Sequence, residues 1–188
     1  SHLGEASMPS LKCLYWIQAA AWVAVIYGSL PWVRPLCEFL KKETPWNGLV
    51  NGLFGGILLL LILYFCRLKP FKTISSYFWG LSLLGIYCAF LVILKIPEER
   101  IHLIQYGFLA FLIWRALHQN GTGRAAGMSK KEEWQYLISF FLTSFLGWVD
   151  EIIQYFLPDR YYQTSDVLLN VAGGGLGLMV VAFLSANG

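Results

Sequence analysis

Long apolar runs separated by short polar segments repeat along the whole chain of 188 residues. A helix needs about 20 mostly apolar residues to cross the roughly 30 Å hydrocarbon core of a bilayer. The pattern predicts six helices, over residues 11–33, 48–66, 74–95, 100–118, 134–157 and 166–186. Every proline falls at or near a helix end, where a helix tolerates it. We therefore expect an all-α, polytopic transmembrane helical bundle of about six helices.

The composition also indicates a membrane protein. Hydrophobic residues make up 57% of the chain and charged residues 13%, whereas soluble domains average about 45–50% and 25%. Lysine and arginine gather in residues 67–72 and 124–131, and positive charge near helix ends marks the cytoplasmic side. We therefore expect a multi-pass protein of the cytoplasmic membrane with both termini in the cytoplasm.

The chain divides by its motifs into parts of one membrane domain. Residues 1–7 precede Met8 and look like the remnant of an expression tag. Residues 8–97 hold three predicted helices without a motif, and residues 98–188 hold the polar motifs described next. Residues 34–43 carry apolar side chains at helical spacing, which predicts either a short helix lying in the membrane interface or a loop.

Polar residues gather at the start of the fourth helix, the end of the fifth and the start of the sixth. The three groups are Glu98, Glu99, His102 and Tyr106; Asp150, Glu151 and Gln154; and Asp166 and Asn170. An ionisable group costs roughly 2.5–3.5 kcal/mol at the bilayer centre and less near its surface. By the topology all three groups reach one leaflet. We therefore expect a polar site at the outer-leaflet ends of helices four to six.

Helical spacing predicts which of these residues face one another. Residues three or four apart share one face of a helix. Glu151 and Gln154 are therefore expected on one face with Asp150 over Gln154, and His102 is expected to stack with Tyr106.

Small residues predict how the helices approach. Gly173 and Gly177 form a small-xxx-small pair, which lets neighbouring helix backbones pack closely in membranes. We expect the sixth helix to pack against the fourth and fifth. That packing would bring Asp166 and Asn170 near His102.

The residue types suit proton transfer and anion binding. A carboxylate beside an imidazole can share proton transfer, and carboxylates in a partly dry pocket separate acid from base roles. We expect Glu151 and His102 to form the acid/base pair, with Asp166 as the third catalytic residue. The planar guanidinium of Arg160 suits a phosphate or carboxylate headgroup. The remaining polar residues are expected to contact substrate: Gln154, Asn170, Tyr106 and Asp150.

Each of these residues also has an ordinary structural explanation. His102 can be a helix-packing histidine, and Asp159 with Arg160 can form an ion pair in a solvated turn. Asp166 can be a helix N-cap. The whole set can also be a polar network that locks three helices together.

A metal site is weakly suggested. Glu99-x-x-His102 has the i, i+3 spacing of carboxylate-bridged metal helices. Only one copy is present, whereas those sites use two, so we expect no metal and no cofactor.

The second half of the chain resembles a known family. The segment Glu99-Arg100-Ile101-His102-Leu103-Ile104-Gln105-Tyr106-Gly107 resembles the Glu/Asp-Lys/Arg-x-x-His-x-x-x-Tyr element of VanZ-like membrane proteins. Residues 150–154, then Pro158-Asp159-Arg160, then Asp166-x-x-x-Asn170-x-x-Gly173 are similar to the second element of that family. Arg115 at the end of the fourth helix is similar too, and the resemblance covers about residues 98–180. Gln105 stands where many members carry an acidic residue, so a carboxylate role at that position is absent here.

The resemblance implies a small protein of the bacterial inner membrane that is associated with resistance to glycopeptide antibiotics, above all teicoplanin. It implies a cellular location and a link to antibiotic resistance, and it does not imply a chemical reaction.

Two functions remain open from the residues. The first is an intramembrane enzyme at the outer leaflet that hydrolyses or transfers part of a lipid-linked envelope precursor or a phospholipid headgroup. The alternative is a non-catalytic protein that binds or transports a lipid or a glycopeptide. Few polar residues line the depth of the helices, which argues against a pore: Gln18, Ser82, Thr143 and Ser144. Membrane lipids are the expected partners, and nothing indicates nucleic acid, because the basic segments fit orientation in the membrane.

Overall fold

The structure is a computed structural model that describes residues 11–67, 74–94, 97–118, 129–158 and 160–187, and this part consists of six α-helices without a strand. The helices are α1 (Leu11–Glu43), α2 (Trp46–Arg67), α3 (Ile74–Ile93), α4 (Pro97–Leu117), α5 (Lys130–Tyr155) and α6 (Thr164–Asn187). The predicted all-α architecture of six helices is therefore confirmed. The tag remnant predicted at residues 1–7 and most of the two basic segments lie outside the described residues.

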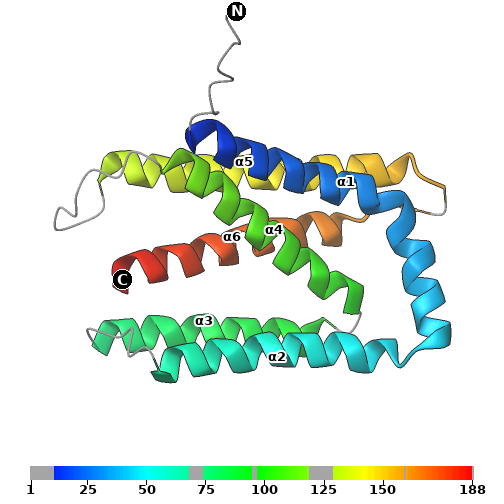
Figure 1. Ribbon diagram of the computed structural model, residues 1–188, viewed down its shortest axis with the longest axis horizontal. Helices are drawn as coiled ribbons and strands as arrows, with labels where there is room; N and C mark the ends of the chain where they lie inside the picture. Colours follow the sequence, from blue (N-terminus) through cyan, green and yellow to red (C-terminus); the bar gives the residue numbers. More distant parts are fainter. Residues whose placement is uncertain (1–10, 68–73, 95–96, 119–128, 159, 188) are drawn as a thin grey trace, which may run out of the picture.

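The first helix is longer than predicted and changes direction toward its C-terminal end (Figure 1). It continues through residues 34–43, which are therefore helical as predicted but extend α1 instead of forming a separate short helix, and the alternative of a loop is wrong. Pro31 and Pro35 lie inside the helix, although we expected them at its end. A proline has no N–H to bond the preceding turn and its ring crowds that turn, so it bends the helix. After the bend, α1 runs down the right-hand side of Figure 1 to the start of α2.

The fifth helix begins four residues earlier than predicted because of its cap. Ser129 Oγ accepts a hydrogen bond from the Glu132 N–H at 3.3 Å, and the Ser129 N–H donates to Glu132 Oε2 at 2.7 Å. This reciprocal capping box satisfies two N–H groups that the helix start would leave unpaired. The polar first turn therefore belongs to α5, although the apolar run starts only at Trp134.

Successive helices run in opposite directions (Figure 1). The ends of α1, α3 and α5 and the starts of α2, α4 and α6 lie toward the right of that view. The three helix ends that carry the predicted site are therefore on the same side of the molecule.

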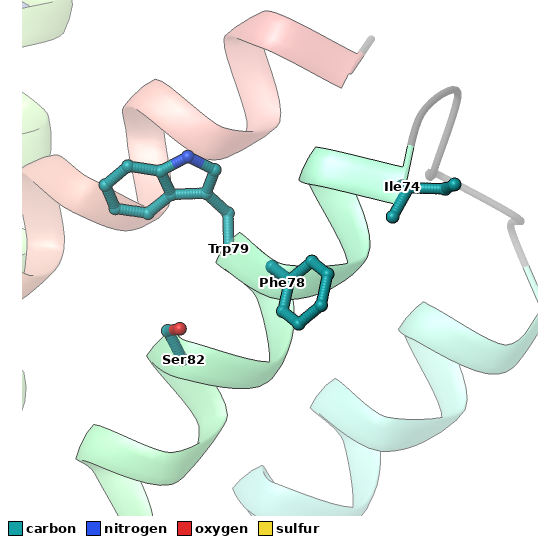
Figure 2. A pocket seen from close by; sticks show the side chains of 4 residues that line it. All are labelled: Ile74, Phe78, Trp79 and Ser82. Carbon is teal, nitrogen blue, oxygen red and sulfur yellow. The ribbon is translucent and has the colours of Figure 1, made fainter.

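Much of the surface is apolar. Among the described residues, three segments are long and apolar enough to cross a membrane, Cys13–Glu43, Lys130–Tyr155 and Thr164–Ala186, and two shorter apolar helices cover Gly48–Leu60 and Ser76–Phe90. Apolar side chains on α2 and α3 are widely exposed, with Leu60 at 67% and Val92 at 79%. On α3 a shallow hollow of about 460 Å³ includes Trp79, which extends toward α6 (Figure 2). Apolar patches of this extent mark contact with a membrane or a partner.

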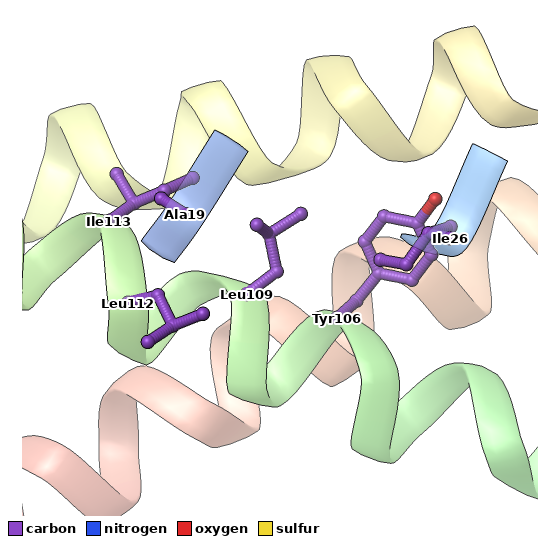
Figure 3. Close-up of a cluster of buried hydrophobic side chains, with 6 residues drawn as sticks. All are labelled: Ala19, Ile26, Tyr106, Leu109, Leu112 and Ile113. Atoms are coloured by element: carbon purple, nitrogen blue, oxygen red, sulfur yellow. The ribbon is translucent and has the colours of Figure 1, made fainter. Parts of the chain in front are cut away.

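The fourth helix forms the centre of the bundle. Its residues Tyr106, Leu109 and Ile113 are at most 1% exposed and pack with Ala19 and Ile26 of α1 (Figure 3). The most extensive helix contact is between α4 and α6. The polar start of α4 is therefore held between two other helices.

Glycines bring α4 and α6 into direct backbone contact. A Cβ added to Gly177 would lie 2.6 Å from the Gly107 Cα, and one added to Gly173 would lie 2.8 Å from the Leu103 carbonyl oxygen. Both distances are shorter than a van der Waals contact. The close approach predicted from Gly173 and Gly177 is thus confirmed, and it is α4 that they approach.

Candidate functional site

The last two turns of α5 bury two neighbouring carboxylates, Asp150 and Glu151. Both residues are 0% exposed, and Gln154 is 3% exposed. Gln154 Nε2 donates to Asp150 Oδ2 at 3.4 Å and to Glu151 Oε1 at 3.1 Å. Neither carboxylate forms an ion pair with any residue that the structure describes. Buried carboxylates are normally paired with a cation or a metal, so this pair departs from ordinary packing.

A chain of hydrogen bonds joins α4, α6 and α5. His102 Nδ1 and Asn170 Oδ1 are 3.0 Å apart, and Asn170 Nδ2 donates to the Gly147 carbonyl oxygen at 3.0 Å. Because the Asn170 amide nitrogen bonds a carbonyl, its Oδ1 is the acceptor that faces His102. A neutral His102 therefore carries its proton on Nδ1, which leaves the lone pair on Nε2 to accept a proton.

Close packing holds this chain in place. A Cβ on Gly147 would lie 2.6 Å from the Asn170 Cβ and 3.2 Å from Cε1 of Tyr106. Only glycine at position 147 therefore lets Asn170 and Tyr106 approach α5 at this level. Tyr106 also stacks with His102, with ring centroids 6.5 Å apart and planes 8° apart.

Two buried polar groups, the Tyr106 hydroxyl of α4 and the Asp150 carboxylate of α5, face each other. The Tyr106 hydroxyl lies near the Asp150 carboxylate, and Asp150 also interacts electrostatically with His102. The Tyr106 hydroxyl and the Asp150 carboxylate interact with each other without forming a well-aligned hydrogen bond. Neither the hydroxyl oxygen of Tyr106 nor Oδ1 of Asp150 has another hydrogen-bond partner in the described part of the chain. A buried polar atom without a partner costs about 1–3 kcal/mol. Both atoms can contact a bound substrate.

The turn after α5 is fastened to the site. Arg160 Nη1 donates to Gln154 Oε1 at 3.0 Å, and its Nη2 donates to the Leu30 carbonyl oxygen of α1 at 3.5 Å. The backbone N–H of Gln163 donates to Glu151 Oε2 at 3.3 Å. A solvated turn is therefore the wrong description for Arg160, which is half-buried, and Asp159 lies outside the described residues.

Asp166 lies in the first turn of α6 and is not its N-cap. The helix begins at Thr164, two residues before the predicted start, so the N-cap alternative for Asp166 is wrong. A carboxylate in the first turn is stabilised by the helix dipole. Ser165 Oγ donates to Asp166 Oδ1 at 3.2 Å, and Asp166 interacts electrostatically with Glu151. Asp166 therefore lies at the edge of the site, half-buried.

The structure describes no cluster that fits a metal. Across the described ranges, no group of three or more His, Cys, Asp or Glu side chains is arranged to hold an ion. Glu99 is half-buried, and the Glu98 side chain lies outside the described residues.

Sequence reasoning did not assign α1 a part in the site. Tyr27 of α1 lies close enough to interact with Asp150 and Tyr106, and its hydroxyl donates to the Leu146 carbonyl oxygen at 2.7 Å. A tyrosine within an apolar helix is a weak signal that could have drawn attention to α1. The Leu30 carbonyl oxygen that Arg160 binds has no signature in the sequence.

These residues lie on elements that one protein family shares. A family model described as VanZ/LLP1 matches residues 15–185. The chain belongs to the VanZ/LLP1 family. The match begins in α1 and so extends beyond residues 98–180, where the sequence motifs were found. Comparisons with curated proteins and with solved structures found no match. Family membership and the three helices able to cross a bilayer identify this VanZ/LLP1 protein as a membrane protein.

Proposed function

We propose that this VanZ/LLP1 protein is an intramembrane enzyme that hydrolyses or transfers part of a lipid headgroup or a lipid-linked envelope precursor. One observation carries the proposal: Asp150 and Glu151 are fully buried without an ion-pair partner among the described residues, beside an oriented His102. Such a group is costly for folding and useful for proton transfer, so burial of this kind is typical of catalytic sites. A purely structural network would instead satisfy its buried polar atoms.

The hydrogen bonds support a division of roles between the two carboxylates. Both oxygens of Glu151 accept hydrogen bonds, one from Gln154 and one from the backbone of the following turn. Asp150 Oδ1 has no well-formed hydrogen bond and lies near His102 and Tyr106. The acid/base role that we assigned to Glu151 from the sequence therefore fits Asp150 better, and Glu151 positions the turn.

In the proposed reaction, His102 Nε2 removes a proton from the attacking hydroxyl of water or of an acceptor. Asp150 stabilises the resulting imidazolium. The deprotonated oxygen attacks the headgroup, and the imidazolium returns its proton to the leaving-group oxygen as the bond to that oxygen breaks. The Tyr106 hydroxyl donates to the oxygen that gains negative charge, because preorganised donors at that atom contribute most to catalysis. Arg160 binds the anionic part of the headgroup, and Asp166 assists at the edge of the site.

We further place the protein in the bacterial cytoplasmic membrane as a multi-pass protein with both termini in the cytoplasm and the site at the outer leaflet. The alternating helices support this, because the end of α5 and the starts of α4 and α6 lie on the opposite side from the end of α2 and the start of α5 (Figure 1), where Arg67, Lys130 and Lys131 are found. A fluorescent protein fused after Gly188 is expected to be bright. Alkaline phosphatase that becomes active at the same position would contradict the orientation.

The same proposal links the site to glycopeptide resistance. Cells that express the protein are expected to tolerate more teicoplanin, and His102→Ala should abolish that gain because a general base contributes about 10²–10⁴-fold to a rate. His118→Ala is the matched control, since His118 bonds Gln135 near the opposite end of α4, about 24 Å from His102 along the helix.

The measurement is the minimal inhibitory concentration of teicoplanin at equal membrane levels of each protein. Full tolerance with His102→Ala would refute the role of this site. Loss with both histidine variants would point to general damage to the bundle.

A further inference from the structure

A cavity of about 430 Å³ lies beside the site, between the bent part of α1 and the turn that follows α5. Its charged wall residues are Arg34, Glu38 and Arg160, and leucine and proline side chains form the rest of the wall. Arg34 and Glu38 belong to none of the motifs found in the sequence. An apolar wall with a few charged groups suits a ligand with an anionic head and an apolar body.

Arg160 connects this cavity to the buried carboxylates. Within the described residues, its side chain donates hydrogen bonds to two neutral oxygens, those of the Gln154 amide and the Leu30 carbonyl. A guanidinium has five N–H donors, so Arg160 has further donors to offer a ligand. Gln154 in turn bonds Asp150 and Glu151, so an anion held by Arg160 would lie one residue away from the proposed catalytic group.

Arg34 provides a second cation on the same wall. Its Nε contacts Glu38 Oε1 at 3.3 Å, and the two side chains are 45% and 61% exposed. An exposed ion pair of this kind contributes little to stability. The Glu38 carboxylate therefore binds the Arg34 guanidinium only weakly. An anion with more oxygens can replace Glu38 as the partner of Arg34.

We propose that the cavity binds the phosphate ester of an amphiphilic ligand between Arg34 and Arg160, with Glu38 as an internal competitor. Two guanidinium groups offer paired N–H donors, which match the several oxygens of a phosphate better than the two of a carboxylate. The apolar body of the ligand lies along the leucine and proline wall. The inference rests on the proposed function in that it names the headgroup on which the neighbouring site acts.

The test is a binding measurement by calorimetry on the full chain in detergent. Three probes are short-chain phosphatidic acid, the diacylglycerol with the same acyl chains, and inorganic phosphate. Arg34→Gln is expected to weaken binding of phosphatidic acid about tenfold or more, because charged hydrogen bonds are lost. Glu38→Gln is expected to tighten it several-fold. Lys42→Gln, which removes an exposed cation of α1 outside the cavity wall, is expected to leave it within about twofold.

The possible results distinguish the phosphate-binding cavity from the enzymatic proposal. Equal weakening by Arg34→Gln and Lys42→Gln, or equal affinity for the diacylglycerol, would overturn the inference. Inorganic phosphate that binds as tightly as phosphatidic acid, with the same dependence on Arg34, would support the phosphate site and assign it a soluble ligand. Arg34-dependent binding by a protein that turns over no lipid would support the cavity and refute only the enzymatic proposal.

Discussion

Replacing Asp150 by asparagine is expected to reduce turnover by at least about 10²-fold without lowering thermal stability. Removing a general acid or base typically costs about 10²–10⁴-fold. Asparagine has nearly the same shape and can still accept the hydrogen bond from Gln154. It also removes a buried carboxylate that has no ion-pair partner among the described residues, and such a group costs stability when charged. We therefore expect an equal or higher melting temperature.

Two further variants make this result specific. Glu151→Gln keeps an oxygen that can accept from the Gln163 N–H, so it should retain measurable turnover. Glu133→Gln changes an exposed acid at the other end of α5 and should behave as the unmutated protein. If Asp150→Asn lowers the melting temperature and loses activity only in proportion to the loss of folded protein, the site is a structural network.

Gly177→Ala is expected to give the largest loss of stability among substitutions of one methyl group. The added Cβ would meet the backbone of Gly107, which cannot rotate away as a side chain would. Overpacking typically costs about 1–3 kcal/mol. The helices must separate to fit it, and α6 would carry Asn170 away from His102, so activity should fall as well.

Gly175→Ala is the matched control on the same helix. Its Cβ would lie 3.6 Å from Phe140 Cε2, which is an ordinary contact. Alanine stabilises a helix interior by roughly 0.5–1 kcal/mol relative to glycine. Both variants share this gain, so they should differ by the overpacking cost of about 1–3 kcal/mol, which appears as a lower thermal unfolding midpoint of Gly177→Ala in detergent. Equal midpoints would show that α4 and α6 do not touch at Gly177.

The sequence was sufficient to predict the six helices because the apolar runs match the thickness of a bilayer. Alternation of the helices then predicted that His102, Glu151 and Asn170 lie on one side, and Gly173 with Gly177 predicted the close packing. Helix ends were predicted less well where polar residues decide them. The Ser129–Glu132 capping box starts α5 before its apolar run.

The contribution of α1 could not be predicted from local patterns. Its bend at Pro31 and Pro35 depends on how the helix packs, and the bend brings Arg34 to the cavity beside Arg160. Spacing also cannot tell which of two adjacent carboxylates keeps an oxygen without a well-formed hydrogen bond. That distinction rests on the Gln163 N–H, which comes from the turn after the helix.

Catalysis by this site is tested most directly by mass spectrometry of lipids. The purified protein and its Asp150→Asn variant, at equal melting temperature, are incubated in lipid with a bacterial extract that contains polyprenyl-linked precursors. We expect a product made only by the unmutated protein, and the change in mass names the bond that breaks. A lipid that co-purifies with the unmutated protein and not with the variant, without any product, would contradict catalysis and establish a binding protein.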